Sequence, residues 1–400
     1  MAKEIKNLHK RHRKEKRFKM LGKASIAFAL FFLVALFSMI LIKSNGAFTR
    51  SQMALEINLP KENIDERALI KQALRERFPE VKSVSEKNSL YQIISKISNL
   101  ELKKEIAKNP EMLGGKHKIY FSLASKADMF IKHNQAEGLN PNQLNFLKAL
   151  QENNEIRTIF NWKFFTFADS REPEIAGIGA AMMGSLLTIT IFLICAFPIG
   201  VMCAFYLEEF APKNRITDII EISINNLAAI PSIIYGLLGL TLYLQFMHLP
   251  RSSTLVGGMT LFMLVLPIII IATRNTIRSI PNSIRDGASA LGASKMQVVL
   301  HHLLPLSIPG IMTGTILAVS RAFGETAPLL MIGMIAFIAD VPQNFLDPSS
   351  VLPVQIYLWS DLPEAGFSQK TAAAILMLLV FLVLLNSVAI YLRKKFERKW

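Results

Sequence analysis

Residues 283–309, SIRDGASALGASKMQVVLHHLLPLSIP, form a long polar break in an otherwise apolar C-terminal half. Their pattern predicts two short helices that meet at a bend. Asn282 and Ser283 are residue types that cap a helix N-terminus, and apolar residues then recur on one helical face. Gly292 falls where a chain that leaves a helix needs a positive φ. A second helix should follow over 295–304 and end at the next residue, a proline.

The flanks of this stretch are long and apolar enough to cross a bilayer, so the helical hairpin should lie at a membrane surface. A surface hairpin without a partner is one interpretation. The other is the cytoplasmic coupling loop of ABC (ATP-binding-cassette) importer permeases, whose signature is Glu-Ala-Ala, three residues, Gly, nine residues and Ile-x-Leu-Pro. Both gaps match, with Asp for Glu, Gly for the first Ala and His302 for Ile. The stretch resembles that loop, and its candidate coupling residues are Arg285, Asp286, Gly287, Ala288, Gly292 and Pro305.

Composition and charge placement indicate a membrane protein with cytoplasmic ends. The chain has 400 residues, 51% of them hydrophobic, and a formal net charge of +15. Ten of the 45 basic residues lie in positions 1–23, and five more lie in 393–399. Each cluster borders an apolar run, which is the positive-inside arrangement and assigns both termini to the cytoplasm. We therefore expect no nucleic-acid partner.

Six apolar runs predict six transmembrane helices, over 24–42, 178–207, 219–247, 255–273, 308–339 and 372–392. The third run is interrupted by Pro231 and Gly236. At about 1.5 Å per residue the fifth run is too long for one ordinary crossing, so it should break near Gly324 and Pro328. Six crossings from a cytoplasmic start return the C-terminus to the cytoplasm.

The remaining segments complete the domain organisation. Residues 1–23 form a basic cytoplasmic tail, and 24–42 form the first transmembrane helix. Residues 43–176 carry 21 basic and 17 acidic side chains with helix-like spacing, which predicts a mainly helical extracytoplasmic domain. Residues 177–400 form a five-helix permease core with the coupling loop at 274–305. The predicted fold class is an all-α polytopic membrane protein.

The sequence carries no motif for catalysis or metal binding. The GGKHK segment at Gly114 lacks the upstream glycine and the Ser or Thr of a P-loop. Cys195 and Cys203 lie in one apolar run without metal-ligand neighbours, which is typical of small core residues. His301 and His302 are adjacent and point in different directions on a helix. We expect no enzyme and no bound cofactor, with any ATP used by partner ATPase subunits.

Polar residues inside the apolar runs are the candidates for a substrate pathway. Arg321 and Glu325 are four residues apart, close enough on a helix to pair. A charge at membrane depth is costly and usually faces a pore or an opposite charge, so this is either a structural ion pair or part of an anion path. Asn225 and Asn226, shortly before Pro231, either line a cavity or accompany a plain helix kink.

Together these segments resemble one family of permeases. The chain is similar to PstA, the permease family of the phosphate-specific importer, in INNLAAIPSIIYGLLGL (224–240), LPIIII (266–271), RAFGETAPLL (321–330), LPVQIY (352–357) and NSVA (386–389). The likeness runs from about 177 to the end of the chain. The family often has an arginine after its LPIII run, where this chain has Ile271, and Arg274 is the nearest candidate to stand in.

The resemblance implies a permease subunit of an ATP-driven phosphate importer, with a type I ABC importer permease fold in the bacterial cytoplasmic (inner) membrane. The implied partners are a second, PstC-like permease, two PstB-like ATPase subunits, a soluble PstS-like phosphate-binding protein and membrane lipid. A permease for sulfate, molybdate or phosphonate is the nearest alternative, because the coupling loop is shared across the superfamily. A membrane-anchored sensor that uses 43–176 is an alternative of another class, and six spans without a cytoplasmic output domain disfavour it.

Overall fold

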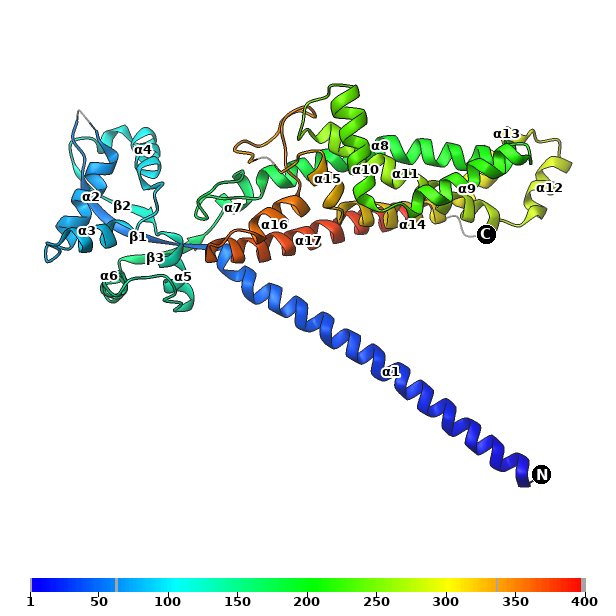
Figure 1. Cartoon of the computed structure of the whole chain (residues 1–400), viewed down its shortest axis with the longest axis horizontal. Helices are drawn as coiled ribbons and strands as arrows, with labels where there is room; N and C mark the ends of the chain where they lie inside the picture. Colours follow the sequence, from blue (N-terminus) through cyan, green and yellow to red (C-terminus); the bar gives the residue numbers. More distant parts are fainter. Residues whose placement is uncertain (1, 62–63, 336, 397–400) are drawn as a thin grey trace.

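The computed structural model describes residues 2–61, 64–335 and 337–396, and these form two parts (Figure 1). A small mixed domain lies at one end, and a bundle of long helices extends away from it. The helix α1 (Ala2–Ser44) leaves the junction and diverges from the bundle. In the basic C-terminal cluster that the sequence indicates, Arg398 and Lys399 lie outside the described residues.

The small domain is built on a three-stranded antiparallel sheet in the order β2-β1-β3. The central strand β1 (Thr49–Asn58) pairs with β2 (Lys116–Ser122) and with β3 (Ile156–Phe160). Buried apolar side chains of β1 and β2 form a core with the surrounding helices, separate from the core of the bundle. These helices are α2 (Glu66–Arg77), α3 (Val84–Tyr91), α4 (Ser98–Lys108), η2 (Pro110–Met112), α5 (Ser125–His133) and α6 (Pro141–Glu152).

The sequence pattern predicts the helices of this domain but not its sheet. The helix α2 begins where Asp65 accepts hydrogen bonds from the backbone N–H groups of Arg67 and Ala68, as an N-cap does. By contrast, five consecutive residues of β1, from Ser51 to Leu55, are buried. A strand covered on both faces lacks the period-two alternation that marks a half-exposed strand. The domain is thus helical with a short central sheet.

The long helices of the bundle pack around α11 (Thr254–Ser279), which lies between α8 (Gly179–Phe205) and α14 (Leu304–Phe323). Two glycines mark the crossings. A Cβ at Gly258 of α11 would fall 2.6 Å from Ile191, and one at Gly314 of α14 would fall 2.3 Å from Ala272. Small residues at crossings let helix backbones approach closely, as is usual within membranes.

The last long helix is α17 (Ala365–Phe396), which packs against α14 and, near the junction, against the C-terminal end of α1. The shorter elements include three π-helical segments, η3, η4 and η5. In chain order the shorter elements are η1 (Asn45–Ala47), α7 (Lys163–Thr166), η3 (Tyr206–Phe210), α9 (Arg215–Ala229), α10 (Ser232–Gly239), η4 (Leu240–Phe246), α12 (Asn282–Ala290), α13 (Lys295–Gln297), η5 (Val298–Leu303), α15 (Ala327–Met331) and α16 (Leu352–Ser360).

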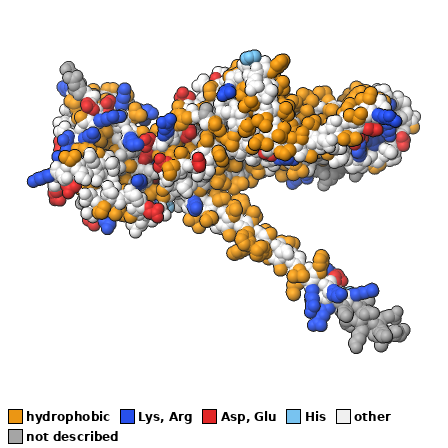
Figure 2. All heavy atoms as spheres, in the orientation of Figure 1, with side chains coloured by type: hydrophobic (Ala, Val, Ile, Leu, Met, Phe, Trp, Pro, Cys, Tyr) orange, Lys and Arg blue, Asp and Glu red, His pale blue; other side chains and the backbone are white. Residues whose placement is uncertain are grey.

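Among the described residues, five helices are long and apolar enough to cross a membrane, or six if the bent pair α9 and α10–η4 counts as one span. Their order agrees with the six apolar runs of the sequence. The helix α14 ends at Phe323, which confirms the predicted break near Gly324. Apolar side chains cover the bundle, while charged side chains gather on the small domain and at the far end (Figure 2).

Three boundary predictions are wrong. The helix α12 begins at Asn282 with Pro281 at the N-cap, so neither Asn282 nor Ser283 caps it. Pro305 does not end the second helix, because α13, η5 and α14 run on as one span. A π-helical segment, η5, directly precedes α14, and Pro305 lies in the first turn of α14. Finally, α11 continues past Arg274 to Ser279.

Candidate functional site

Two helix breaks meet inside the bundle, and the first separates α9 from α10. The two helices are bent by 101° across Ile230 and Pro231. Proline has no N–H group to extend the hydrogen-bond pattern of the helix that precedes it, and α9 ends before Pro231. The hydroxyl of Tyr235 on α10 donates a 2.7 Å hydrogen bond to the carbonyl oxygen of Leu227 on α9. This bond ties the start of α10 to the end of α9, where the Leu227 carbonyl also accepts from the backbone N–H of Ile230.

The second break separates α14 from α15 at 324–326. Arg321 lies in the last turn of α14, and Glu325 lies beyond its end. Arg321 Nε is 3.9 Å from a carboxylate oxygen of Glu325, which is longer than a hydrogen bond. Their side chains are 49% and 21% exposed. The sequence correctly predicts that the two groups are close, and the half-exposed guanidinium is not tightly held.

Gly236 brings the two breaks together. A Cβ at this position of α10 would fall 2.7 Å from Cα of Pro328 and 2.9 Å from Cβ of Met331, both on α15. Only a residue without a side chain allows this approach. The helices that follow the two breaks, α10 and α15, are therefore neighbours in the fold, although they are far apart in the sequence.

The predicted pathway residues lie on two different helices. Asn225 and Asn226 are exposed on α9, before the first break, whereas Arg321 precedes the second break and Glu325 lies within it. Within the described parts of the chain no hydrogen bond joins the asparagines to that pair. Apolar side chains beside the asparagines are also exposed: Ile219, Ile222 and Leu227 on α9, and Ile233 and Leu237 on α10. This face of the single chain is suited to contact with lipid or with another membrane subunit.

The predicted coupling residues lie at the end of the bundle farthest from the small domain (Figure 1). Gly292 has φ +84°, as the sequence predicts, and this conformation favours glycine. Asp286 and Gly287 are exposed, while Ala288 is buried against the bundle. Three apolar side chains at and after the bend, Leu291, Met296 and Leu300, are exposed. The bend therefore offers a surface that another protein can contact.

Unlike these exposed side chains, the side chain of Arg285 points toward the bundle. Its guanidinium donates to a carboxylate oxygen of Glu209 and to the carbonyl oxygens of Ile277 and Ile280, all at 2.9–3.0 Å. Sequence reasoning missed Glu209 and its neighbour Glu208, which belong to η3. The available signal was an acidic pair, in YLEEF at 206–210, at the end of an otherwise apolar run.

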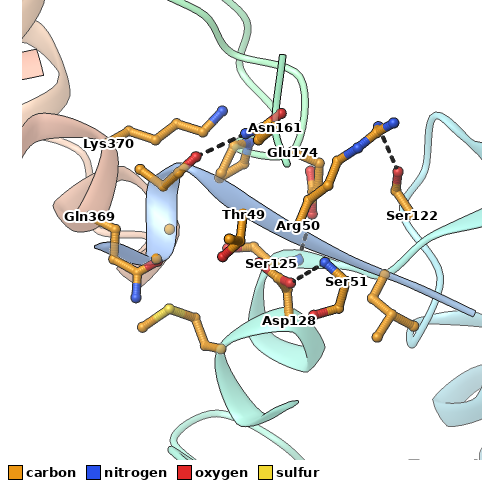
Figure 3. Close-up of a pocket in the computed structure, with 16 residues that line it drawn as sticks. Thr49, Arg50, Ser51, Ser122, Ser125, Asp128, Asn161, Glu174, Gln369 and Lys370 are labelled. Atoms are coloured by element: carbon orange, nitrogen blue, oxygen red, sulfur yellow. Dashed lines mark hydrogen bonds between the residues drawn. The ribbon is translucent and has the colours of Figure 1, made fainter. Parts of the chain in front are cut away.

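A small cavity of about 40 Å³ lies where the small domain meets α17 (Figure 3). Its lining includes Arg50 and Ser51 of β1, Glu174 from the linker before α8, and Lys370 of α17. Glu174 accepts a hydrogen bond from the backbone N–H of Ser125, and Lys370 donates to the carbonyl of Ala176. Burial raises the pKa of Glu174 above its ordinary value. The junction is thus a polar contact that ties the small domain to the last helix.

Known proteins match this chain in two segments. A family described as "Binding-protein-dependent transport system inner membrane component" matches residues 196–400, and "Domain of unknown function (DUF3333)" matches 5–140. The phosphate transport system permease protein PstA of Haemophilus influenzae is 32% identical over 236 residues, which cover 59% of this chain and 81% of that protein. The probable ABC transporter permease protein YqgI of Bacillus subtilis is 31% identical over 236 residues, or 55% and 79% of the two chains.

Solved structures give weaker likenesses. The inward-facing MetNI methionine ABC transporter is 16% identical, with a TM-score of 0.43 over 55% of this chain and 97% of that one. A bacterial ABC transporter that imports the acidic polysaccharide alginate is 17% identical, with a TM-score of 0.42 over 57% and 82% of the two chains.

The apolar spans, the two broken helices and the exposed bend define a multi-pass membrane permease subunit. Because the matching family model covers half of the chain, the chain can be assigned to that family directly. The chain belongs to the binding-protein-dependent transport system inner membrane components, and it is a multi-pass inner-membrane protein. Its fold is mostly helical, as predicted, apart from the three-stranded sheet of the small domain.

Proposed function

We propose that this chain is the permease subunit of an ATP-driven importer of inorganic phosphate. Arg321 carries the proposal, because its half-exposed guanidinium stands at a helix break inside a membrane bundle. A guanidinium offers paired N–H donors that match two oxygens of a phosphate and replace part of its hydration shell. Glu325, 3.9 Å away, balances that charge when no anion is present. Relatives called phosphate transport system permease protein PstA support phosphate as the anion.

The proposed complex assigns a partner of the phosphate importer to each exposed surface of the single chain. A second, PstC-like permease covers the exposed face of α9 and α10 and completes the path past Asn225 and Asn226. One of two PstB-like ATPase subunits docks at α12 and its bend, and the two subunits bind and hydrolyse the ATP. A soluble PstS-like phosphate-binding protein delivers the anion from the side of the small domain.

The proposed orientation rests on the basic clusters next to the apolar spans. The N-terminal part of α1, the loop that holds α12 and the C-terminal part of α17 face the cytoplasm. The small domain, which lies at the opposite end of the bundle, is then extracytoplasmic (Figure 1). A permease for another oxyanion has the same architecture, so the anion must be tested directly.

The test is to co-express the chain with candidate ATPase, permease and binding-protein partners and to measure ATP hydrolysis by the purified complex. We expect the ATPase to co-purify, and phosphate-loaded binding protein to stimulate hydrolysis more than sulfate, molybdate or phosphonate do with their own binding proteins. Stimulation by one of those other anions alone would assign the permease to that anion. A chain that purifies without an ATPase would contradict the importer and favour a sensor built on the small domain.

A further inference from the structure

A network of six charged side chains joins four helical elements at the end of the bundle farthest from the small domain. Arg274 Nε is 2.6 Å from Glu208, and Arg274 Nη2 is 2.6 Å from Glu221. Arg278 contacts the same two carboxylates at 3.0 and 3.1 Å. Arg285 pairs with Glu209 at 2.9 Å. The elements involved are η3, α9, α11 and α12.

The central part of this network is buried. The Arg274 side chain is 7% exposed and that of Glu208 is 14% exposed. Three arginines face three carboxylates, so the network is neutral as a whole. Separating a buried charge from its partner is strongly destabilising, so Glu208 must follow Arg274 if α11 moves. Glu221 is 32% exposed and is held by contacts with both Arg274 and Arg278.

The adjacent residues Glu208 and Glu209 connect the two halves of the network. Glu208 reaches α11, whereas Glu209 reaches Arg285 on α12. Arg285 also donates to the carbonyl groups of Ile277 and Ile280 at the C-terminal end of α11. Helix C-termini attract cations in this way, and the contact fixes α12 against both α11 and η3.

Glu221 extends the network toward the pathway. It lies one helical turn before Asn225 on α9, so the two side chains share a face of that helix. A displacement of α12 can therefore pass through Arg285 and Glu209 to η3, and through Glu208, Arg274 and Glu221 to α9.

We infer that Glu208, Glu209, Glu221 and Arg274 are positioning residues that couple the ATPase-docking helix α12 to the pathway helix α9. This inference rests on the proposed function. The alternative is that the network only holds the bundle together, in which case its loss lowers stability and assembly but leaves the transport yield of each assembled complex unchanged.

The experiment uses the complete complex in proteoliposomes and measures phosphate taken up per ATP hydrolysed. Glu221→Gln removes the ion pairs that join α9 to Arg274 and Arg278, while the ion pair between Arg274 and Glu208 remains. Asp218→Asn is the matched control, because it removes one acidic charge from an exposed site one turn earlier on the same helix. We expect the ratio to fall at least fivefold in Glu221→Gln, with ATP hydrolysis within twofold of wild type, and to stay within twofold in Asp218→Asn.

Equal ratios in the two variants would overturn the inference. Should Glu221→Gln fail to assemble, Glu209→Gln tests the same route at the α12 contact, where Arg285 keeps its two backbone acceptors. A wild-type ratio in an assembled Glu209→Gln complex would likewise overturn the inference. Absence of phosphate uptake by the wild-type complex is a distinct outcome, since it would refute the proposed function and with it the coupling route.

Discussion

Replacing Gly236 with alanine perturbs the contact between the two helix breaks. The new Cβ would fall 2.7 Å from Cα of Pro328 and 2.9 Å from Cβ of Met331. Carbon atoms in van der Waals contact are about 3.5–4.0 Å apart, so α10 and α15 would have to separate by about 1 Å. The nearest atom belongs to the backbone, so rotation of a side chain cannot relieve the clash. Overpacking of this kind costs about 1–3 kcal/mol.

The assay is thermal unfolding of the purified protein in detergent, followed by tryptophan fluorescence. Gly287→Ala is the matched control, since a Cβ at Gly287 meets nothing within 4 Å. That glycine lies inside α12, where alanine should stabilise the helix by about 0.5–1 kcal/mol. The same substitution should therefore lower the unfolding temperature at 236 and leave it unchanged or raise it at 287. A Gly236→Ala protein as stable as wild type would refute the close packing of α10 on α15.

Three further predictions concern the bend, the anion path and the junction. Gly292→Val places a β-branched side chain at φ +84°, at a cost of about 1–2 kcal/mol. The protein should insert into the membrane but retain less ATPase on co-purification. Retention of the ATPase at the wild-type level would count against the bend as the docking element. Arg321→Gln combined with Glu325→Gln leaves no unpaired charge, so the complex should assemble but take up phosphate poorly; near wild-type uptake per complex would exclude an essential role for Arg321. Burial raises the pKa of Glu174, so the folded protein keeps this proton to higher pH than the unfolded chain, and wild-type stability should fall as pH rises above 4.5 through the raised pKa. Glu174→Gln should reduce that fall in thermal unfolding across pH, and an unchanged profile would contradict the assignment.

Much of the fold is predictable because membrane spans carry a strong local signal. Apolar runs, a proline at 231 and a glycine at 324 predict the spans and both breaks from sequence alone. The boundaries around Pro305 are not predictable in this way. A proline usually ends a helix. Here the chain continues from η5 through Pro305 into α14, and Pro198, Pro267 and Pro309 also lie inside helices.

The candidate site is less predictable, because its contacts are distant in the sequence. The four-residue spacing of Arg321 and Glu325 predicts their proximity. The glycine at 292 predicts the positive φ that the backbone has there. By contrast, Arg285 and Glu209 are 76 residues apart, and no local pattern pairs them. The strand β1 is missed for a related reason, since partners on both faces remove the alternation that would identify it.

The most direct test of the proposed function is phosphate uptake by proteoliposomes that contain the complete complex, with binding protein outside and ATP inside. We expect labelled phosphate to accumulate only when ATP is hydrolysed, and an excess of unlabelled sulfate or molybdate to leave that uptake unchanged. ATP hydrolysis without phosphate accumulation, or uptake that sulfate or molybdate abolishes, would contradict the assignment of this chain as a phosphate importer permease.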